Sequence, residues 1–259
     1  MSNITSGGNN GIGYATVQAL LESKRSYHVL MGCRSRERAA AAIESLQNEF
    51  PDVSNRVEAV QVDITSDESI EKAFETVSAK FDHIDVLINN AGAAFGNTPE
   101  SKLTLREAFN KTYDVNLSGT HIMTYTFIRL LLRSSDPRLL FVAGLANATQ
   151  ASEKYFPTPP QPAGWPKKIA FETIPYRCSK VALNMLMLDW NHKLQADGVK
   201  VWSVGPGFLK TDLGGMRHLA DAMGCGPASL GGEMLLSVVE GERDADVGKI
   251  VIKSGLSSF

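Results

Sequence analysis

The chain has 259 residues, of which 43% are apolar and 21% are charged, so it can bury a sizeable core and is not disordered. Its 26 basic and 28 acidic residues give a formal net charge of −2, which argues against nucleic acid or an anionic membrane surface as a partner. The longest apolar stretches fall far short of the roughly 20 residues that a membrane span needs. We therefore expect no nucleic-acid and no membrane partner.

Cysteine usage and the N-terminal sequence predict the compartment. Cys33, Cys178 and Cys225 are odd in number, widely spaced and without a CxxC pair, which favours a reducing environment. The first residues carry neither a charged nor an apolar signal region. The five histidines show no paired ligand spacing, so we expect no metal site. The sequence thus predicts a cytoplasmic protein without a metal.

Short β-rich runs alternate with helical patterns, which is typical of a parallel sheet covered by helices. The predicted strands are residues 29–31, 57–62, 86–88, 139–142, 199–204 and 249–252. The predicted helices are residues 13–23, 35–48, 66–81, 103–132 and 176–195, the third with Ser66 as its N-cap. Without an internal repeat or a flexible linker, residues 1–259 are expected to form a single domain with a doubly wound α/β fold and helices on both faces of the sheet.

Two segments are predicted to be irregular. Residues 155–175 contain six prolines, and residues 205–232 contain eight glycines. We expect loops over about 145–175 and 205–232 to bind the substrate, with surface decoration as the alternative. The first loop also supplies four aromatic side chains as possible walls of an apolar pocket, namely Tyr155, Phe156, Trp165 and Phe171.

A glycine-rich loop lies at the first predicted strand-to-helix turn, where Gly7, Gly11 and Gly13 precede a helical pattern. Glycines allow a tight turn and let backbone amides approach a pyrophosphate at the helix N-terminus. At the end of the next strand, Arg34, Ser35 and Arg36 stand where an NAD-selecting chain has an acidic residue. This pattern predicts NADP(H), and the alternative is that the arginines only begin a solvated helix.

Tyr176 and Lys180 are four residues apart, which places both side chains on one face of a helix. A phenol has a pKa of about 10, and a nearby ammonium favours the phenolate and lowers that pKa. The pair therefore suggests proton transfer by tyrosine.

Six motifs in this order resemble the short-chain dehydrogenase/reductase family across nearly the whole chain. They are Gly7-x-x-x-Gly11-x-Gly13, Asp63 after the third strand, Asn89-Asn90-Ala91-Gly92, Asn116 within a helix, Tyr176-x-x-x-Lys180 and Pro206-Gly207-x-x-x-Thr211. The resemblance implies a Rossmann fold and a nicotinamide cofactor.

The resemblance also implies residue roles. Tyr176 would be the general acid for carbonyl reduction and the base for alcohol oxidation, Lys180 would hold the nicotinamide ribose and lower the phenol pKa, and Asn116 would support a proton-relay water chain. Asp63 would face the adenine amine, and Thr211 the carboxamide or diphosphate. The full set of expected cofactor-binding residues is Gly7, Asn10, Gly11, Ile12, Gly13, Arg34, Ser35, Asp63, Ile64, Asn90, Ala91, Gly92, Tyr176, Lys180, Pro206, Gly207 and Thr211.

Two features depart from the family pattern. The catalytic serine after the fifth strand is replaced by Ala143 and Gly144, and Thr149 or Ser152 is a candidate substitute. Only Ile4 and Thr5 precede Ser6 as an apolar start, so we expect a weak first strand with under-paired neighbours or a gene model that begins late.

The expected function is NADP(H)-dependent reduction of a carbonyl, or oxidation of the alcohol, on an apolar small molecule. One alternative is non-redox chemistry (isomerisation, cyclisation or dehydration) around a retained NADP(H), and another is a sensor that only binds NADP(H). The resemblance further implies a homodimer or homotetramer built on helices 103–132 and 176–195, whose apolar faces are otherwise internal core.

Overall fold

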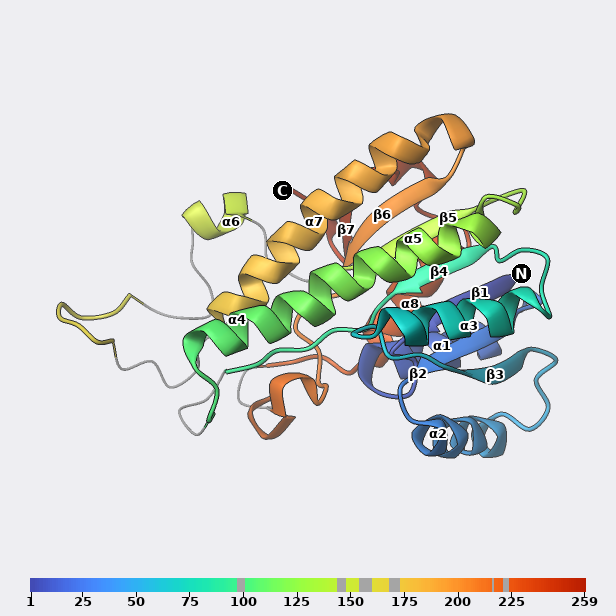
Figure 1. Ribbon diagram of the computed structural model, residues 1–259, viewed down its shortest axis with the longest axis horizontal. Coiled ribbons are helices and arrows are strands. Elements are labelled where there is room, and N and C mark those ends of the chain that lie inside the picture. Colours follow the sequence, from blue (N-terminus) through green and yellow to red (C-terminus); the bar gives the residue numbers. More distant parts are fainter. Residues whose placement is uncertain (97–100, 144–147, 154–159, 168–172, 216, 221–223) are drawn as a thin grey trace.

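The computed structural model describes residues 1–96, 101–143, 148–153, 160–167, 173–215, 217–220 and 224–259, and its eight described strands form one sheet (Figure 1). The strand order is β3-β2-β1-β4-β5-β6-β7-β8, and only the β7–β8 pair is antiparallel. The strands are β1 Ser2–Ser6, β2 His28–Cys33, β3 Arg56–Gln61, β4 Val86–Asn89, β5 Arg138–Val142, β6 Lys200–Gly205, β7 Ile250–Ile252 and β8 Gly255–Ser257. The predicted doubly wound Rossmann fold is confirmed.

Helices cover both faces of the sheet. One face carries α3 (Asp67–Ser78), α5 (Thr120–Leu131) and α7 (Ile174–Leu194), which lie side by side in Figure 1. The other carries α1 (Gly11–Glu22), α2 (Arg36–Glu49) and α8 (Ser229–Val239). Alternate strand residues face opposite ways, so Leu87 and Leu139 enter the first core whereas Ile88 and Leu140 enter the second. The strands therefore appear as continuous apolar runs in the sequence.

The first strand is better paired than the sequence predicts. β1 has five residues and pairs over all five with β2, and over Asn3–Thr5 with β4. The expectation of under-paired neighbours is therefore wrong, because the polar Ser2 and Asn3 continue the strand that Ile4 and Thr5 suggest. Asn3 is fully buried despite its polar side chain.

The predicted helix over residues 103–132 is divided into three parts. After α4 (Leu105–Tyr113), residues Asp114–Gly119 form a π-helical segment that leads directly into α5. Backbone angles stay in the right-handed helical region through both junctions. Such π segments occur frequently at functional sites, and this one contains Asn116.

Helix α8 is absent from the sequence predictions, and its first residues fall inside the segment that was expected to be a loop. Its glycines serve close packing rather than flexibility. A Cβ on Gly232 would lie 2.2 Å from the carbonyl oxygen of Ala15 in α1, and one on Gly231 would lie 2.9 Å from the Leu209 side chain. Strand β8 and the short helix α6 (Ala148–Glu153) are also additions to the predicted elements.

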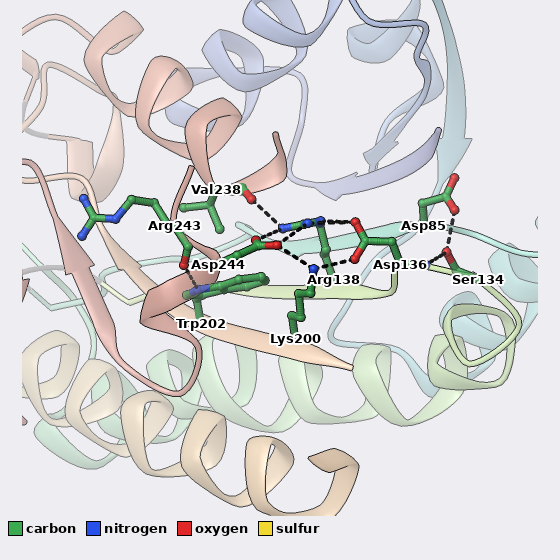
Figure 2. A network of polar contacts seen from close by, with 9 residues as sticks. All are labelled: Asp85, Ser134, Asp136, Arg138, Lys200, Trp202, Val238, Arg243 and Asp244. Atoms are coloured by element: carbon green, nitrogen blue, oxygen red, sulfur yellow. Dashed lines mark hydrogen bonds and ion pairs between the residues drawn. The ribbon is translucent and has the colours of Figure 1, made fainter. Parts of the chain in front are cut away.

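At the amino ends of the strands, a charged network joins β5 to the C-terminal part of the chain (Figure 2). The guanidinium of Arg138 is almost completely buried and forms ion pairs with Asp136 at 2.8 Å and Asp244 at 2.6 Å. Lys200 on β6 contacts the same two carboxylates, at 2.8 and 2.6 Å. Arg138 also donates to the carbonyl of Val238 at the end of α8.

No helix in the described ranges combines the length and the apolar character that crossing a membrane requires.

Candidate active site

A cavity of about 800 Å³ opens at the carboxyl ends of the strands, where the strand order reverses between β1 and β4. Ligands of doubly wound sheets bind at such a reversal. Fourteen of the predicted site residues line this cavity, namely Gly7, Asn10, Gly11, Ile12, Arg34, Ser35, Asp63, Ile64, Asn90, Ala91, Gly92, Tyr176, Lys180 and Thr211. Gly13, Asn116, Pro206 and Gly207 are not among the lining residues.

Gly13 does not line the cavity and instead packs against the glycine turn at Gly7. A Cβ at this position would lie 2.2 Å from the carbonyl oxygen of Gly7 and 2.5 Å from Nδ2 of Asn90, so no larger residue fits. Asn90 in turn donates to the carbonyls of Ser6 at 2.9 Å and Gly7 at 3.2 Å. Gly7 and Gly11 have φ of 66° and 54°, which glycine adopts readily. The loops after β1 and β4 are therefore fixed against each other.

Ser6 joins the same two loops at its hydroxyl. Its Oγ accepts hydrogen bonds from the backbone amides of Asn90 and Ala91, each at 3.0 Å, and donates to the carbonyl of Ile88 at 3.4 Å. The side chain is buried. One hydroxyl thus bonds both amides where the chain leaves β4, and the amide of Asn90 also donates to the carbonyl of Ile88 at 3.1 Å.

At the basic end of the cavity, Arg38 takes the position that the sequence predicted for Arg36. Arg34 and Arg38 line the cavity, whereas Arg36 points to Gln61, whose Oε1 lies 2.8 Å from its Nε. Neither Arg34 nor Arg38 takes part in an ion pair within the described ranges. Arg38 lies in the first turn of α2, and the sequence alone does not distinguish it from Arg36 as the arginine that reaches the cavity.

Ser35 lines the cavity as predicted, and its hydroxyl has two partners within the protein. Its Oγ accepts from the amide of Arg38, which makes it the N-cap of α2, and donates to Glu37 at 2.7 Å. The Ser35 hydroxyl lowers the pKa of Glu37. The carboxylate is thereby tied to the helix start, and Glu37 is not a lining residue.

Asp63 follows β3 and keeps its carboxylate at the cavity wall. Oδ1 accepts from the backbone amide and hydroxyl of Thr65, at 3.0 and 2.8 Å, and the backbone amide of Asp63 donates to Ser69. These local bonds orient the side chain without using Oδ2 in any of them.

Tyr176 and Lys180 lie on one face of α7 as the spacing predicts, with Lys180 Nζ 5.7 Å from the centroid of the phenol ring. Burial raises the pKa of Tyr176 to about 12 and lowers the pKa of Lys180 to about 8. The ammonium donates to the carbonyl of Val142 at 2.7 Å. In the protein alone, desolvation thus opposes the predicted lowering of the phenol pKa, and Tyr176 is protonated at neutral pH.

Asn116 lies directly behind the cavity. It is fully buried, its Oδ1 accepts from the amide of Ala93 at 2.7 Å, and its Nδ2 donates to the carbonyl of Ala93 and to Ser179 Oγ, each at 2.9 Å. A Cβ on Gly92 would lie 3.4 Å from both Asn116 Oδ1 and Lys180 Nζ. These two polar atoms therefore border the same small space, which exists because residue 92 has no side chain.

The structure places the serine substitutes away from the cavity. Ala143 is fully buried, and Gly144 lies outside the described residues. Both candidate replacements are exposed: Thr149 hydrogen-bonds to the carbonyl of Phe259, and Ser152 donates to the carbonyl of Thr149 at 2.7 Å. Neither is among the lining residues.

Of the four predicted aromatic walls, only Trp165 is described, and it is 87% exposed, so it forms no pocket wall in this structure. Tyr155, Phe156 and Phe171 lie outside the described residues. The apolar lining instead comes from residues of other elements, namely Ala93, Ala94, Phe95, Val115, Val142 and Leu213.

The segment after β6 closes the remaining side. Thr211 lines the cavity together with Asp212 and Leu213, and its side chain lies 3.3 Å from where a Cβ of Gly11 would be. Pro206 is buried at the end of β6, and Gly207 turns the chain with φ of 96°. These two residues thus shape the exit from the strand, and Thr211 is the member of this motif that reaches the site.

This sheet, with its glycine turn and a cavity at its point of reversal, defines a Rossmann-type α/β protein. The sequence profile of the short chain dehydrogenase family matches residues 3–154. The short-chain dehydrogenase/reductase tropE of Talaromyces stipitatus is 47% identical over 97% of this chain and 95% of its own length. The corresponding protein eupG of a Phoma species is 42% identical, over 93% and 90%.

The chain belongs to the short-chain dehydrogenase/reductase family, and it is an oxidoreductase of that family. The resemblance drawn from the six motifs is thereby confirmed. Among solved structures, the NADPH-bound carbonyl reductase from chicken fatty liver has a similar fold, with a TM-score of 0.80 at 24% identity over 100% of this chain and 98% of that one.

Proposed function

We propose that this protein reduces a carbonyl group of an apolar small molecule with NADPH, or oxidises the corresponding alcohol with NADP⁺. The observation that carries the proposal is that one cavity holds a half-buried tyrosine beside a buried lysine and two arginines without carboxylate partners in the described ranges. The pair suits proton transfer, and the arginines suit a phosphate. The apolar lining between β4, β5 and the π segment favours an apolar substrate.

The residues present fit this cofactor. The glycine turn offers backbone amides to a pyrophosphate at the start of α1, and Arg34 and Arg38 offer guanidinium donors to the 2′-phosphate. Lys180 has two further N–H groups beyond the bond to Val142 with which to hold ribose hydroxyls. When bound, NADPH supplies the hydride.

In reduction, Tyr176 donates its phenol proton to the oxygen that gains charge as the carbonyl carbon receives hydride. The high phenol pKa keeps this proton available at neutral pH in the protein alone. The Lys180 ammonium stabilises the phenolate that remains, since the two groups share one helix face. The space bordered by Asn116 Oδ1 and Lys180 Nζ is suited to a water that returns the proton.

Tyr176→Phe tests the acid role. We expect kcat for NADPH-dependent carbonyl reduction to fall by about 10²–10⁴, while the Kd for NADPH stays nearly constant, because only the hydroxyl is removed. Tyr14→Phe is the matched control, since the Tyr14 hydroxyl donates to Ser45 at an exposed site between α1 and α2 and Tyr14 does not line the cavity. Equal activity of both variants would exclude Tyr176 as the proton donor.

Cofactor preference is tested by single arginine substitutions. Arg34→Ala and Arg38→Ala should each weaken NADPH by about tenfold to a hundredfold and hardly affect NADH, because a charge-assisted hydrogen bond contributes about 1.5–3 kcal/mol. Arg36→Ala is the control, since this side chain contacts Gln61 instead of the cavity. Equal weakening of both cofactors by Arg34→Ala would contradict the 2′-phosphate assignment.

The second candidate function is non-redox chemistry around a retained NADP(H), and the observation that favours it is Ala143 in place of a hydroxyl donor. A panel of aromatic ketones, quinones and diketones distinguishes the two. Steady NADPH consumption supports the reductase, and product formation without net oxidation supports the alternative. NADPH binding with neither result supports a sensor.

Two further sequence predictions remain predictions, a cytoplasmic location and a homodimer or homotetramer. For the oligomer, Tyr125 on α5 and Met185 on α7 support a contact between copies, because they are 68% and 63% exposed on the faces turned away from the sheet. Sedimentation of the wild type and of Tyr125→Glu/Met185→Glu tests it. A wild type that sediments as a monomer would contradict it.

A further inference from the structure

Ser179 is a fully buried residue of α7 that has no place among the residues lining the cavity. Its hydroxyl donates to the backbone carbonyl of Tyr176 at 2.7 Å and accepts from Asn116 Nδ2 at 2.9 Å. It therefore connects the turn of α7 that carries the phenol to the π segment that carries Asn116. No other described side chain makes both of these contacts.

The polarity of these bonds orients the Asn116 amide. Because the Ser179 hydroxyl donates its hydrogen bond to the backbone carbonyl of Tyr176, its oxygen can accept one from another group. Nδ2 is the atom of the Asn116 amide that can donate it. Ala93 requires the same orientation, with its amide facing Oδ1 and its carbonyl facing Nδ2. Both Nδ2 hydrogens are thus used.

This orientation determines which atom faces Lys180. With Nδ2 turned to Ser179 and the Ala93 carbonyl, Oδ1 borders the space beside Gly92 that Lys180 Nζ also borders. A water in this space can accept from Lys180 Nζ and donate to Asn116 Oδ1, which fixes its orientation, whereas two donors there would leave both of its hydrogens without these partners. The placement of Oδ1 depends on the residues that hold Nδ2.

We propose that Ser179 is a positioning residue of the active site, which holds the Asn116 amide in register with the helix turn that carries Tyr176 and Lys180. This role rests on the proposed carbonyl reduction. Ser179 acts only through Asn116 and the backbone of α7, since its hydroxyl contacts neither the cavity nor the phenol oxygen.

The first test is Ser179→Ala against a matched control. We expect kcat to fall about three- to tenfold, as for one lost hydrogen bond, with KM and the Kd for NADPH within twofold of wild type. Ser203→Ala is the control, because the Ser203 hydroxyl makes a 2.9 Å bond to Asn184 on the same helix, is equally buried and lies away from the cavity. A kcat loss that Ser203→Ala matches would overturn the proposal.

Two further variants separate positioning from general stability. Added to Asn116→Ala, the substitution Ser179→Ala should cause no further loss of kcat, because the residue acts through Asn116. Ser179→Thr should restore kcat, since a helical threonine hydroxyl can bond the carbonyl three residues earlier. Additive losses, or a threonine variant as slow as the alanine variant, would count against it. If Ser179→Ala does not fold, Ser179→Cys takes its place, because sulfur is a weak hydrogen-bond partner.

A readout without turnover keeps this inference separate from the proposed function. The ¹⁵N side-chain amide signal of Asn116, identified by its loss in Asn116→Asp, should shift and exchange faster with solvent in Ser179→Ala. An unchanged signal would contradict the positioning role. If wild type reduces no carbonyl in the panel, the proposed function fails, and the amide signal still decides the role of Ser179.

Discussion

The Lys180 ammonium lies 5.7 Å from the centre of the Tyr176 ring, and burial moves the pKa values of the two groups further apart, to about 8 and about 12. Both shifts have the same cause, which is that desolvation disfavours whichever form is charged. The site therefore keeps a neutral phenol beside an ammonium that burial destabilises. A bound negatively charged group would relieve the lysine.

The buried lysine predicts a gain in stability when it is replaced. Because the pKa of Lys180 is lower in the folded state, the unfolded chain binds more protons between about pH 8 and the ordinary lysine value near 10.4, and stability rises with pH across that window. At pH 7, Lys180→Met should increase the free energy of unfolding by on the order of 1–3 kcal/mol while turnover is lost. The advantage should shrink as pH rises through this window.

Urea unfolding of wild type and Lys180→Met at pH 7 and pH 10 measures this difference. Lys193→Met provides the control, because Lys193 is an exposed lysine on the same helix. A Lys180→Met variant that is less stable at pH 7 would show that the bond to Val142 outweighs the cost of burying the charge.

The Gly92→Ala variant should fold normally but have a reduced kcat. The new methyl group would meet Asn116 Oδ1 and Lys180 Nζ at 3.4 Å each, which is ordinary contact, so no backbone shift is required. It would occupy the space that these two atoms border. We expect an unchanged melting temperature within a few degrees and a kcat reduced by about tenfold or more. Normal kcat with an unchanged melting temperature would mean that no water is needed at this place.

Ser6→Ala should weaken cofactor binding through the loops it joins. The substitution removes the partner of the Ala91 amide and leaves the Asn90 amide with the carbonyl of Ile88 alone, and a buried unsatisfied donor costs about 1–3 kcal/mol. Ser6→Thr keeps the hydroxyl and is the matched control. Isothermal titration with NADPH should show weaker binding for alanine than for threonine, and the reverse order would contradict the role assigned to the hydroxyl.

Arg138→Met should destabilise the protein without affecting the site. Removing the guanidinium leaves Asp136 and Asp244 facing each other with only Lys200 between them. Breaking a buried pair costs about 3–5 kcal/mol, and we expect about 2–3 here because both carboxylates are partly exposed. Chemical unfolding measures the loss, and a Kd for NADPH equal to that of wild type confirms that the cavity is untouched.

The same network predicts sensitivity to acid. The hydrogen bond from Arg138 lowers the pKa of Asp244; burial acts to raise the pKa of Asp136, but hydrogen bonds from Lys200 and Arg138 hold it below its usual value. Carboxyls with lowered pKa values stabilise the fold above their unfolded pKa, and this contribution is lost as pH falls through the folded values. Wild type should therefore lose more stability below pH 4 than Arg138→Met does, which melting curves from pH 7 to pH 3 can measure.

Short-range patterns predicted most of the sheet and half of the residues that line the cavity. Buried parallel strands form continuous apolar runs, so each of the six predicted strands corresponds to a strand of the structure. Ser66 caps α3 as expected, accepting from the amide of Ser69. The site residues that follow strands or glycines could be found because the carboxyl ends of parallel strands meet at one edge.

The features that could not be predicted depend on contacts between distant segments. Arg38 rather than Arg36 reaches the cavity because Gln61 on β3 holds Arg36. The first turn of helix α8 contains glycines, which in the sequence indicate a loop. The structure shows that they are needed because α1 packs closely against them at Ala15. The proposed role of the Ser179 hydroxyl depends on its hydrogen bond with Asn116, which lies 63 residues earlier in the chain. Local sequence carries no signal for such pairings.

The π-helical segment at residues 114–119 has a consequence for how this helix could evolve. Each residue of an α-helix rotates the chain by about 100° around the helix axis. A wider π turn therefore changes the direction in which the side chains after it point. Here that phase change lets α4 pack on α7 while α5 packs on β4 and α3. A one-residue deletion between Asp114 and Gly119 would convert the π segment to α-helix, rotate α5 relative to α4 and turn one of these two faces toward solvent. Length in this stretch is therefore constrained even where side-chain identity is not.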